Sequence, residues 1–304
     1  MSKNLTWWVL FVSLLLGLMT SSWVMLVFMM EVSLFAFIFL VSDYSLLSVS
    51  VTGIKYFFAQ TVGSILLFSG VLSFLWTNNC FSLAMVILPG LFFKLGVFPF
   101  HFWVVPVNKG LTYLMLGILG SPMKILPLWF FNNCYWVYMY NISGLLLFLG
   151  MFSMVMGMFL GLKSNTIREM LGASSISHSG WLLFSVLSND IILYFIFYSL
   201  GLFSVIFALV GYQPRLVSIC LLGLSGLPPF GVFLGKVLVI SHLIAWSGSL
   251  WYLVGALISA VMSLYYYLKF SYFFLLHKHD CTGVFLICVI LMFNIFCGWL
   301  YFLG

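Results

Sequence analysis

The sequence predicts an all-α protein that crosses a membrane many times. Hydrophobic residues make up 64% of its 304 positions, charged residues only 5%, and the mean hydropathy is +1.25, whereas soluble domains are roughly 45–50% apolar and 25% charged. Uncharged apolar runs of about 20 residues recur along the chain, each long enough to cross about 30 Å of hydrocarbon as a helix. The sequence does not show the alternating runs of about 10 residues that are typical of a transmembrane β-barrel.

Charged residues and clusters of Gly, Pro, Ser and Asn divide the chain into about eleven predicted crossings. The predicted spans are 4–20, 22–42, 50–75, 81–120, 122–138, 142–162, 166–187, 191–211, 216–246, 250–276 and 283–302. No connecting segment is long or polar enough for a soluble domain, so residues 1–304 are predicted to form a single transmembrane domain. The first apolar run continues into the second without a small-residue cleavage site, which predicts insertion by the first helix itself.

Two of the predicted crossings are interrupted by proline. In 81–120 the pieces before Pro99 and after Pro106 are each too short to cross alone, and in 216–246 the interruption is "SGLPPFG" at Ser225–Gly231. Proline removes an amide donor and clashes with the preceding turn, so both helices are expected to be discontinuous. These are the fourth and ninth crossings, which run in opposite directions. That pattern is typical of an inverted repeat with a transport site at the breaks.

Loop charges predict the orientation, because loops kept on the inner side carry the excess of Lys and Arg. The side that holds the N-terminus carries almost all of the basic loop residues, whereas the other side carries almost only Asp190. The basic residues are Lys3, Lys163, Arg168, Arg215 and Lys278, with Lys55 near that surface. The N-terminus is therefore predicted to lie on the inner side.

Several kinds of chemistry are excluded by the sequence. The six cysteines have no metal-ligand spacing and mostly lie in apolar runs, which favours free thiols over disulfides or a metal site. "HKHD" at His277–Asp280 is expected to be a solvated loop, and His101, His178 and His242 offer no clear pair of axial haem ligands. The sequence contains no P-loop, dinucleotide fingerprint, nucleophile elbow or basic aromatic patch for nucleic acid. We expect no redox centre and no nucleotide hydrolysis in this chain.

Five ionisable side chains are predicted to lie at membrane depth, the first two being Glu31 and Lys94. An unpaired carboxylate at this depth would be neutral or strongly destabilising, so we interpret Glu31 as the partner of a buried lysine; the alternative is a protonated, hydrogen-bonded glutamate. Lys94 precedes Pro99 by about five residues, roughly 7 Å of helix, and its alternative is an ammonium that extends to the surface. Burial disfavours the ammonium and a carboxylate favours it, so such a lysine can change charge when its partner moves.

The other three are Lys124, His178 and Lys236. Lys236 lies deep in the second interrupted crossing, and we interpret it as functional. Lys124 is close to Pro122 and an uncertain helix start, where extension to the surface is a rival interpretation. Lys55 and Lys269 lie nearer predicted helix ends, where extension to the surface is the default. Together the five side chains are expected to form a polar line through the membrane that relays protons.

His178 is expected within a helix that starts with the capping-box pattern of Thr166 and Glu169. It lies about 12 residues into that helix, roughly 18 Å along it. Neighbouring serines at helical spacing form a polar stripe with it on an otherwise apolar segment: Ser174, Ser175 and Ser179. A hydrogen-bonded core histidine and a hydrated stripe both remain open.

Five stretches carry a resemblance to a known family. They are "KLGVFPFHFWVVPV" at Lys94–Val107, "SSISHSGW" at Ser174–Trp181, "GLSGLPPFGVFLGK" at Gly223–Lys236, "KYFFAQTVGSILL" at Lys55–Leu67 and "LYYYLKFSY" at Leu264–Tyr272. In combination they resemble the subunit 2 family of NADH dehydrogenase, respiratory complex I, over most of the chain from about Glu31 to Tyr272. The proline-interrupted lysine helices alone also occur in sister subunits and in related cation/proton antiporters.

The resemblance implies an antiporter-like subunit of the membrane arm of NADH:ubiquinone oxidoreductase in the mitochondrial inner membrane, with its N-terminus toward the matrix. It implies that NAD, FMN, iron–sulfur clusters and ubiquinone act in other subunits, and that the partners are neighbouring membrane-arm subunits and phospholipids. About eleven helices, rather than the fourteen of bacterial relatives, resemble the animal mitochondrial version. The alternatives are a free-standing cation/proton antiporter and a structural spacer whose charges do not turn over.

Motif by motif, the resemblance implies that Glu31 is the carboxylate paired with Lys94, Lys124 the central relay lysine and Lys236 the terminal lysine. His178 falls where the family carries a histidine near the proton path. Two positions depart from the family pattern: Glu169 stands where a second basic residue often follows Arg168, and "VVPVNKG" lacks the usual acidic residue after proline. These two positions are not given the family's roles.

Overall fold

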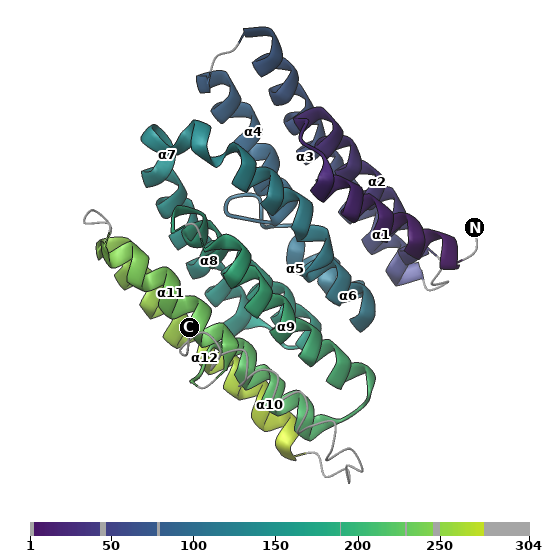
Figure 1. The fold of residues 1–304 in the computed structure, drawn as a ribbon. Helices are drawn as coiled ribbons and strands as arrows, with labels where there is room; N and C mark the ends of the chain where they lie inside the picture. Colours follow the sequence, from purple (N-terminus) through teal and green to yellow (C-terminus); the bar gives the residue numbers. More distant parts are fainter. Residues whose placement is uncertain are drawn as a thin grey trace. The chain divides into compact units, whose positions relative to one another are not determined.

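The computed structural model of the chain describes residues 3–42, 47–77, 80–188, 190–228, 230–245 and 250–276. Over these ranges the chain forms twelve α-helices and no strand (Figure 1). Six stretches of the described residues are long and apolar enough to cross a membrane. The prediction of an all-α protein with several crossings is thus confirmed for this part of the chain. The chain divides into two compact units, Met1–Leu149 and Gly150–Gly304.

The first unit holds six helices and the beginning of a seventh. They are α1 (Lys3–Met19), α2 (Trp23–Ser42), α3 (Leu47–Thr77), α4 (Cys80–Leu95), α5 (Val104–Gly110), α6 (Tyr113–Gly120) and the start of α7 (Pro122–Lys163). Helix α2 packs on both α1 and α3, and α3 also packs on α4 and α5. Glycines let α3 and α4 approach closely, because a Cβ on Gly90 would lie 2.9 Å from the carbonyl oxygen of Gly63. This close pairing positions Lys94 against α3.

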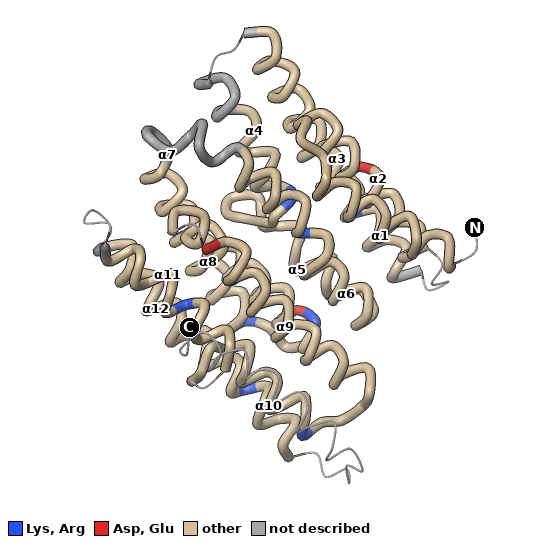
Figure 2. The backbone as a smooth tube through the Cα atoms, viewed as in Figure 1, with Lys and Arg blue, Asp and Glu red and all other residues tan. Residues whose placement is uncertain are grey.

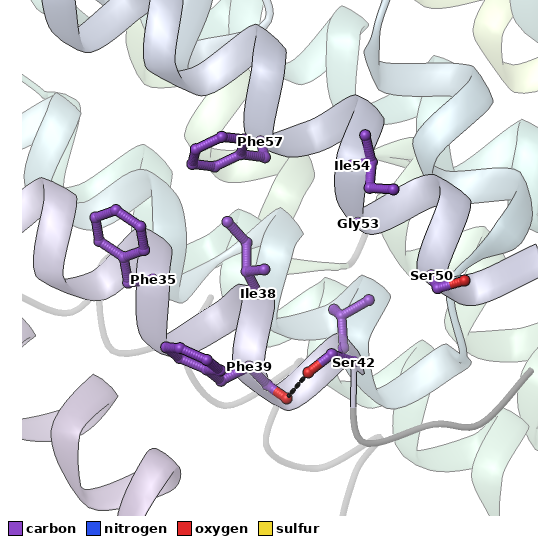
Figure 3. A pocket seen from close by; sticks show the side chains of 9 residues that line it. Phe35, Ile38, Phe39, Ser42, Ser50, Gly53, Ile54 and Phe57 are labelled. Carbon is purple, nitrogen blue, oxygen red and sulfur yellow. Dashed lines mark hydrogen bonds between the residues drawn. The ribbon is translucent and has the colours of Figure 1, made fainter. Parts of the chain in front are cut away.

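An apolar pocket of about 390 Å³ lies between α2 and α3 in the first unit. Phe35 and Phe39 of α2 and Ile54 and Phe57 of α3 point into it (Figure 3). No charged side chain lines it. The pocket is therefore separate from the ionisable groups that form the candidate site.

The second unit holds the end of α7 and five further helices. They are α8 (Ile167–Leu187), α9 (Ile191–Val210), α10 (Pro214–Ser225), α11 (Gly231–Ala245) and α12 (Leu250–Leu276). The start of α8 confirms the predicted capping box: the Glu169 amide donates to Thr166 Oγ1 at 3.4 Å, and the Thr166 amide donates to Glu169 Oε2 at 3.3 Å. Helices α9 and α12 each pack on α8, α10 and α11, so they hold these three helices together.

Most predicted spans coincide with helices, but two boundaries were wrong. The predicted break at 138–142 is not a helix boundary, because α7 runs from Pro122 to Lys163, although separate membrane-length stretches, Tyr113–Asn133 and Ser143–Lys163, lie on its two sides as predicted. That break was placed at a cluster of asparagines, which disfavour a helix only weakly, and neither Gly nor Pro occurs between residues 128 and 143. The predicted crossing 81–120 was drawn too long, because α6 is separated from α7 only by Ser121 and Tyr113–Asn133 is itself a 21-residue apolar stretch. The predicted span 283–302 lies outside the described residues.

Candidate functional site

The first helix break begins at Gly96, three residues earlier than the proline to which it was assigned. Helix α4 ends at Leu95, and Gly96 adopts a left-handed conformation with φ +68°. The Val97 amide then donates to the carbonyl oxygen of Phe92 at 3.0 Å, which is the Schellman pattern. Trp103 Nε1 donates to the carbonyl oxygen of Phe93 at 3.1 Å. Two carbonyls that a helix end leaves free are satisfied in this way, as membrane depth requires.

Lys94 lies in the last turn of α4 and reaches a carboxylate on α2. Its Nζ donates to Glu31 Oε1 at 3.0 Å, and the lysine side chain is 3% exposed against 25% for the glutamate. The lysine stem lies on α3, since a Cβ on Gly63 would be 3.3 Å from Lys94 Cγ. The buried Tyr56 of α3 also interacts electrostatically with Glu31. A cation in the last turn of a helix is further stabilised by the helix dipole.

The segment after this break carries several buried polar atoms. Five buried polar atoms of the first unit have no hydrogen-bond partner within the described ranges, three of them in this segment: Gln60 Nε2, His101 Nδ1, Asn108 Oδ1, Thr112 Oγ1 and Trp129 Nε1. Buried polar groups in proteins are normally satisfied by protein atoms or by ordered water. This part of the first unit therefore offers donors and acceptors to water, close in sequence and packing to Lys94.

Lys124 lies beside the short interruption between α6 and α7 in the first unit. Its amide donates to the carbonyl oxygen of Ser121 at 3.0 Å, where α6 gives way to α7. The residue is 5% exposed and lies near the middle of the apolar stretch Tyr113–Asn133. This burial argues against the rival interpretation, in which the ammonium extends to the surface.

The second helix break holds Lys236 by main-chain and aromatic groups. Helix α10 ends at Ser225, Gly226 is left-handed with φ +81°, and α11 begins at Gly231, as the sequence predicted. Lys236 Nζ donates back to the carbonyl oxygen of Ser225 at 2.8 Å and lies 5.7 Å from the centre of the Trp181 ring. The residue is 7% exposed. It forms no salt bridge with any described residue.

His178 is hydrogen-bonded to tyrosines that sequence reasoning missed. Its Nδ1 lies 2.8 Å from the Tyr194 hydroxyl and its Nε2 lies 3.4 Å from the Tyr267 hydroxyl. The Tyr198 ring centre is 4.6 Å from the imidazole centre, and Trp181 stacks on Tyr194 with ring centres 6.5 Å apart. Helix spacing was the available signal, because Tyr194 and Tyr198 are four residues apart on α9 and so share a face. His178 and Lys236 thus belong to one cluster, joined through Trp181 and Tyr194.

The serine stripe beside His178 is bonded within its own helix. The hydroxyls donate to carbonyls three residues back: Ser174 to Leu171 at 2.8 Å, Ser175 to Gly172 at 2.8 Å and Ser179 to Ile176 at 2.7 Å. The small residues of α8 also let α7 approach, because a Cβ on Gly157 would lie 2.6 Å from the Ser177 amide nitrogen. These contacts favour a packed helix face over a hydrated stripe.

The remaining sequence predictions have simpler outcomes. Lys55 is exposed, and Lys269 Nζ lies 3.4 Å from the carbonyl oxygen of Ser164. Cys220 is a buried free thiol. No group of three metal-binding side chains occurs among the described residues. "HKHD" at His277–Asp280 lies outside them.

These observations define a class of protein: a multi-spanning helical membrane protein with lysines buried at interrupted helices, in a chain with few charges (Figure 2). Comparison with known proteins narrows this class. The family described as "NADH:quinone oxidoreductase/Mrp antiporter, TM" matches residues 20–215. NADH-ubiquinone oxidoreductase chain 2 of Albinaria caerulea is 36% identical over 298 residues, with 95% of this chain and 94% of the relative covered. The same protein of Anopheles gambiae is 34% identical over 297 residues, with 89% and 85% covered.

Solved structures share the fold at low identity. A chain of respiratory complex I from Thermus thermophilus with bound aureothin matches with a TM-score of 0.80 and 20% identity, covering 98% of this chain and 76% of that one. A chain of the Mrp complex from Dietzia sp. matches with a TM-score of 0.81 and 16% identity, covering 90% and 61%. The chain therefore belongs to the NADH:quinone oxidoreductase/Mrp antiporter transmembrane family and, within it, to the NADH-ubiquinone oxidoreductase chain 2 family.

Proposed function

We propose that the chain is a proton-translocating subunit of the membrane arm of respiratory complex I. The observation that carries this proposal is the buried Lys94–Glu31 ion pair at the end of a broken helix, with N···O 3.0 Å. Ionisable groups inside a membrane protein are costly and generally mark ion or proton pathways. Membership of the chain 2 family supplies the complex in which the pair acts.

In this proposal Lys94 changes its charge as Glu31 approaches or withdraws. The carboxylate stabilises the ammonium, and its withdrawal leaves a buried cation that releases its proton. Lys124 relays the proton within the membrane, and the unpartnered polar atoms of Gln60 and Asn108 support a hydrated route near these lysines. His178 and Lys236 handle the proton in the second unit. Energy enters from NADH oxidation and ubiquinone reduction in other subunits.

The finer architecture is part of the same proposal. The chain forms about eleven crossings in a single antiporter-like domain of residues 1–304, with inverted repeats that each contain a broken helix. It lies in the mitochondrial inner membrane with its N-terminus toward the matrix, beside other antiporter-like subunits and phospholipids. NAD, FMN, iron–sulfur clusters and ubiquinone are bound by other subunits. The loop-charge asymmetry and the left-handed glycines at both breaks support this arrangement.

The test is proton pumping by the intact complex in proteoliposomes. Lys94→Met and Lys236→Met are expected to lower the number of protons moved per NADH oxidised, because each removes a titratable group from the path. Lys55→Met is the matched control, since Lys55 is an exposed lysine of the first unit, and it should pump as the unmodified complex does. Assembled Lys94→Met and Lys236→Met complexes with the unmodified stoichiometry would contradict the proposal and favour a structural spacer.

A free-standing cation/proton antiporter is the second candidate, favoured by the fold shared with the Mrp complex chain at a TM-score of 0.81. Native gel separation of mildly solubilised membranes distinguishes the two. A complex I subunit should appear by mass spectrometry in the large band that oxidises NADH in the gel. A chain found only in a small band without NADH oxidation would be the antiporter.

A further inference from the structure

A second ionisable pair lies in the second unit, outside the cluster of His178 and Lys236. His242 Nδ1 of α11 lies 2.5 Å from Oδ2 of Asp190, the residue that precedes α9. The side chains are 50% and 16% exposed, so the imidazole is half-exposed while the carboxylate is largely covered. Asp190 Oδ2 has no hydrogen bond of regular geometry among the described residues, so its close contact with the imidazole is not an aligned hydrogen bond.

The pair lies at the end of a membrane crossing. Ile191–Val210, which follows Asp190 directly, is a 20-residue apolar stretch long enough to span a membrane. Helix α11 packs on α9, and His242 is in its last turn. The C-terminal end of α11 therefore meets the N-terminal end of α9 where the apolar stretch begins.

The pair also lies next to the buried cluster. Tyr194, which contacts His178, follows Asp190 by four residues on α9, about 6 Å of helix rise. Lys236 precedes His242 by six residues on α11, about 9 Å. The two helices touch at the cluster end of this stretch, because a Cβ on Gly235 would lie 3.0 Å from Tyr194 Cδ2. One helix turn or two thus separates the half-exposed pair from the buried groups of the cluster.

We propose that Asp190 and His242 form the site at which the second unit exchanges protons with water on one side of the membrane. This inference rests on the proposed function of the His178–Lys236 cluster. Protonated His242 releases its proton to bulk water, and the neutral imidazole takes up the next proton from the cluster on its Tyr194 side. Asp190 stabilises the imidazolium between the two steps. Histidine suits this role because an imidazole can carry a proton from one partner to another.

The elements packed around the pair carry other titratable groups. They are Arg168, Glu169 and His178 of α8, Tyr194 and Tyr198 of α9, Arg215 and Cys220 of α10, Lys236 of α11, and Tyr252, Tyr265, Tyr266, Tyr267, Lys269 and Tyr272 of α12. The first turn of α8 holds Arg168 and Glu169, and the first turn of α10 holds Arg215. Both turns lie at the ends of α8 and α9 that are opposite to Asp190. Tyr252, in the first turn of α12, follows the end of α11 closely in the sequence.

The test uses the intact complex in proteoliposomes with NADH supplied outside and the pH of the lumen and the bath set independently. Asp190→Asn and His242→Gln are expected to make the NADH oxidation rate at least twofold less sensitive to lumen pH between about 5 and 8, with the bath dependence unchanged. Asp190→Glu should retain the sensitivity. Both Asp190 variants should fold, because Asp190 makes no side-chain cap bond and Asn is favoured before a helix. Ser241→Ala is the control, since this exposed neighbour bonds only to its own helix.

Lys236→Met in the same preparation separates this inference from the proposed function. If Lys236→Met lowers pumping while the pair variants keep the unmodified lumen pH dependence, the pair is only a structural contact and the inference is wrong. If the pair variants change lumen and bath dependences equally, the inference is also wrong. If the Lys236→Met complex pumps as the unmodified complex does, the proposed function itself is wrong, and the inference that rests on it is wrong with it.

Discussion

The two helix breaks hold their lysines by different partners. At the first break Lys94 donates to the Glu31 carboxylate of another helix, whereas at the second Lys236 donates to the main-chain oxygen of Ser225 and lies near the Trp181 ring. The charge of Lys94 therefore depends on a side chain that can move. The charge of Lys236 depends on a helix end that is fixed. Under the proposed function, we interpret the first break as the one that switches and the second as the one that holds its lysine.

The two breaks nevertheless share one structural feature. Each first half-helix, α4 or α10, closes with a left-handed glycine, Gly96 or Gly226, and each ammonium lies at the carbonyl end of that half-helix. Lys94 is part of its half-helix, whereas Lys236 reaches back from α11. The negative end of a helix stabilises a nearby cation in both cases. A carboxylate is therefore an addition to this arrangement and not a requirement for burying a lysine.

The largest expected effect is that of Glu31→Gln, which removes the carboxylate alone. Lys94 is 3% exposed, so without the carboxylate it would either keep a buried charge unpaired or give up its proton at a cost in free energy. Breaking a buried ion pair in this way typically costs about 3–5 kcal/mol. The variant complex should lose this subunit at a distinctly lower temperature, measured by heating followed by native gel analysis and mass spectrometry.

The double variant Glu31→Gln, Lys94→Met sharpens this result. Removing both charges leaves no unpaired ion, so the double variant should be more stable than Glu31→Gln alone. Equal loss of stability in the two variants would indicate that the pair matters through packing and not through charge.

The next effect concerns the two left-handed glycines. Gly96→Ala should destabilise the first unit, because the left-handed conformation costs about 1–2 kcal/mol and the new Cβ would lie 2.5 Å from Val104 Cγ2. Gly226→Ala carries the same conformational cost, but its Cβ would lie 2.9 Å from Lys236 Nζ, a group that can move. We expect Gly96→Ala to lower the thermal stability more, and Gly226→Ala to lower proton pumping more at equal assembly.

Gly144→Ala is the control for these two variants, because a Cβ on Gly144 would meet no atom of another residue within 4 Å. This variant should therefore behave as the unmodified chain does. If Gly226→Ala and Gly96→Ala lose stability and pumping in the same proportion, the distinction between a holding break and a switching break fails.

Lys236→Met should affect stability less than Glu31→Gln does. Removing this lysine leaves a main-chain oxygen without its donor but no buried charge, a loss of about 1.5–3 kcal/mol for a hydrogen bond to a charged group. Pumping should nevertheless fall. Thermal loss of the subunit and protons moved per NADH are to be measured on the same preparation. A Lys236→Met complex as unstable as Glu31→Gln would indicate a further charged partner of this lysine.

The sequence predicted the helices better than their ends. Long apolar runs such as 22–42 and 191–211 leave little choice, because only a helix satisfies every backbone group at that depth. The end of α4 was assigned to Pro99, but a left-handed glycine and a tryptophan side chain end it at Leu95. Gly96 was a local signal for this end, because glycine is common directly after a helix, whereas the contact of Trp103 with Phe93 depends on how the later segment folds back.

The site was predicted residue by residue, but its contacts were not. Burial of Lys94, Lys124 and Lys236 followed from the cost of charge in apolar runs, and the geometry places Glu31 against Lys94. Their roles in translocation stay predictions. The partners of His178 and Lys236 come from α9, α12 and a main-chain carbonyl. Tertiary packing selects such partners. Every residue has a main-chain carbonyl, so the sequence does not show which carbonyl will bind the lysine.

A smaller effect separates the two tyrosines at His178. Tyr194→Phe removes a hydroxyl 2.8 Å from Nδ1, whereas Tyr267→Phe removes one 3.4 Å from Nε2. Hydrogen bonds inside membrane proteins average about 0.6 kcal/mol and reach about 1.7 kcal/mol. We expect Tyr194→Phe to lower the stability of the subunit toward the upper value and Tyr267→Phe by less. The reverse order, measured by thermal loss of the subunit, would mean that Nε2 carries the stronger bond.

The smallest effect is expected for Ser179→Ala, beside His178 on α8. The Ser179 hydroxyl donates to the Ile176 carbonyl of its own helix at 2.7 Å, and that carbonyl is already within the helix ladder. Losing such a bond should change stability by about 0.6 kcal/mol or less, and pumping should stay unchanged because the hydroxyl's proton is directed at the backbone. A hydrated stripe predicts the opposite, since an alanine there would remove a water-binding group from the path of the proton. If Ser179→Ala clearly lost pumping at normal stability, the serine stripe would be part of the proton path. The second unit would then take part in switching, as we propose for the first break.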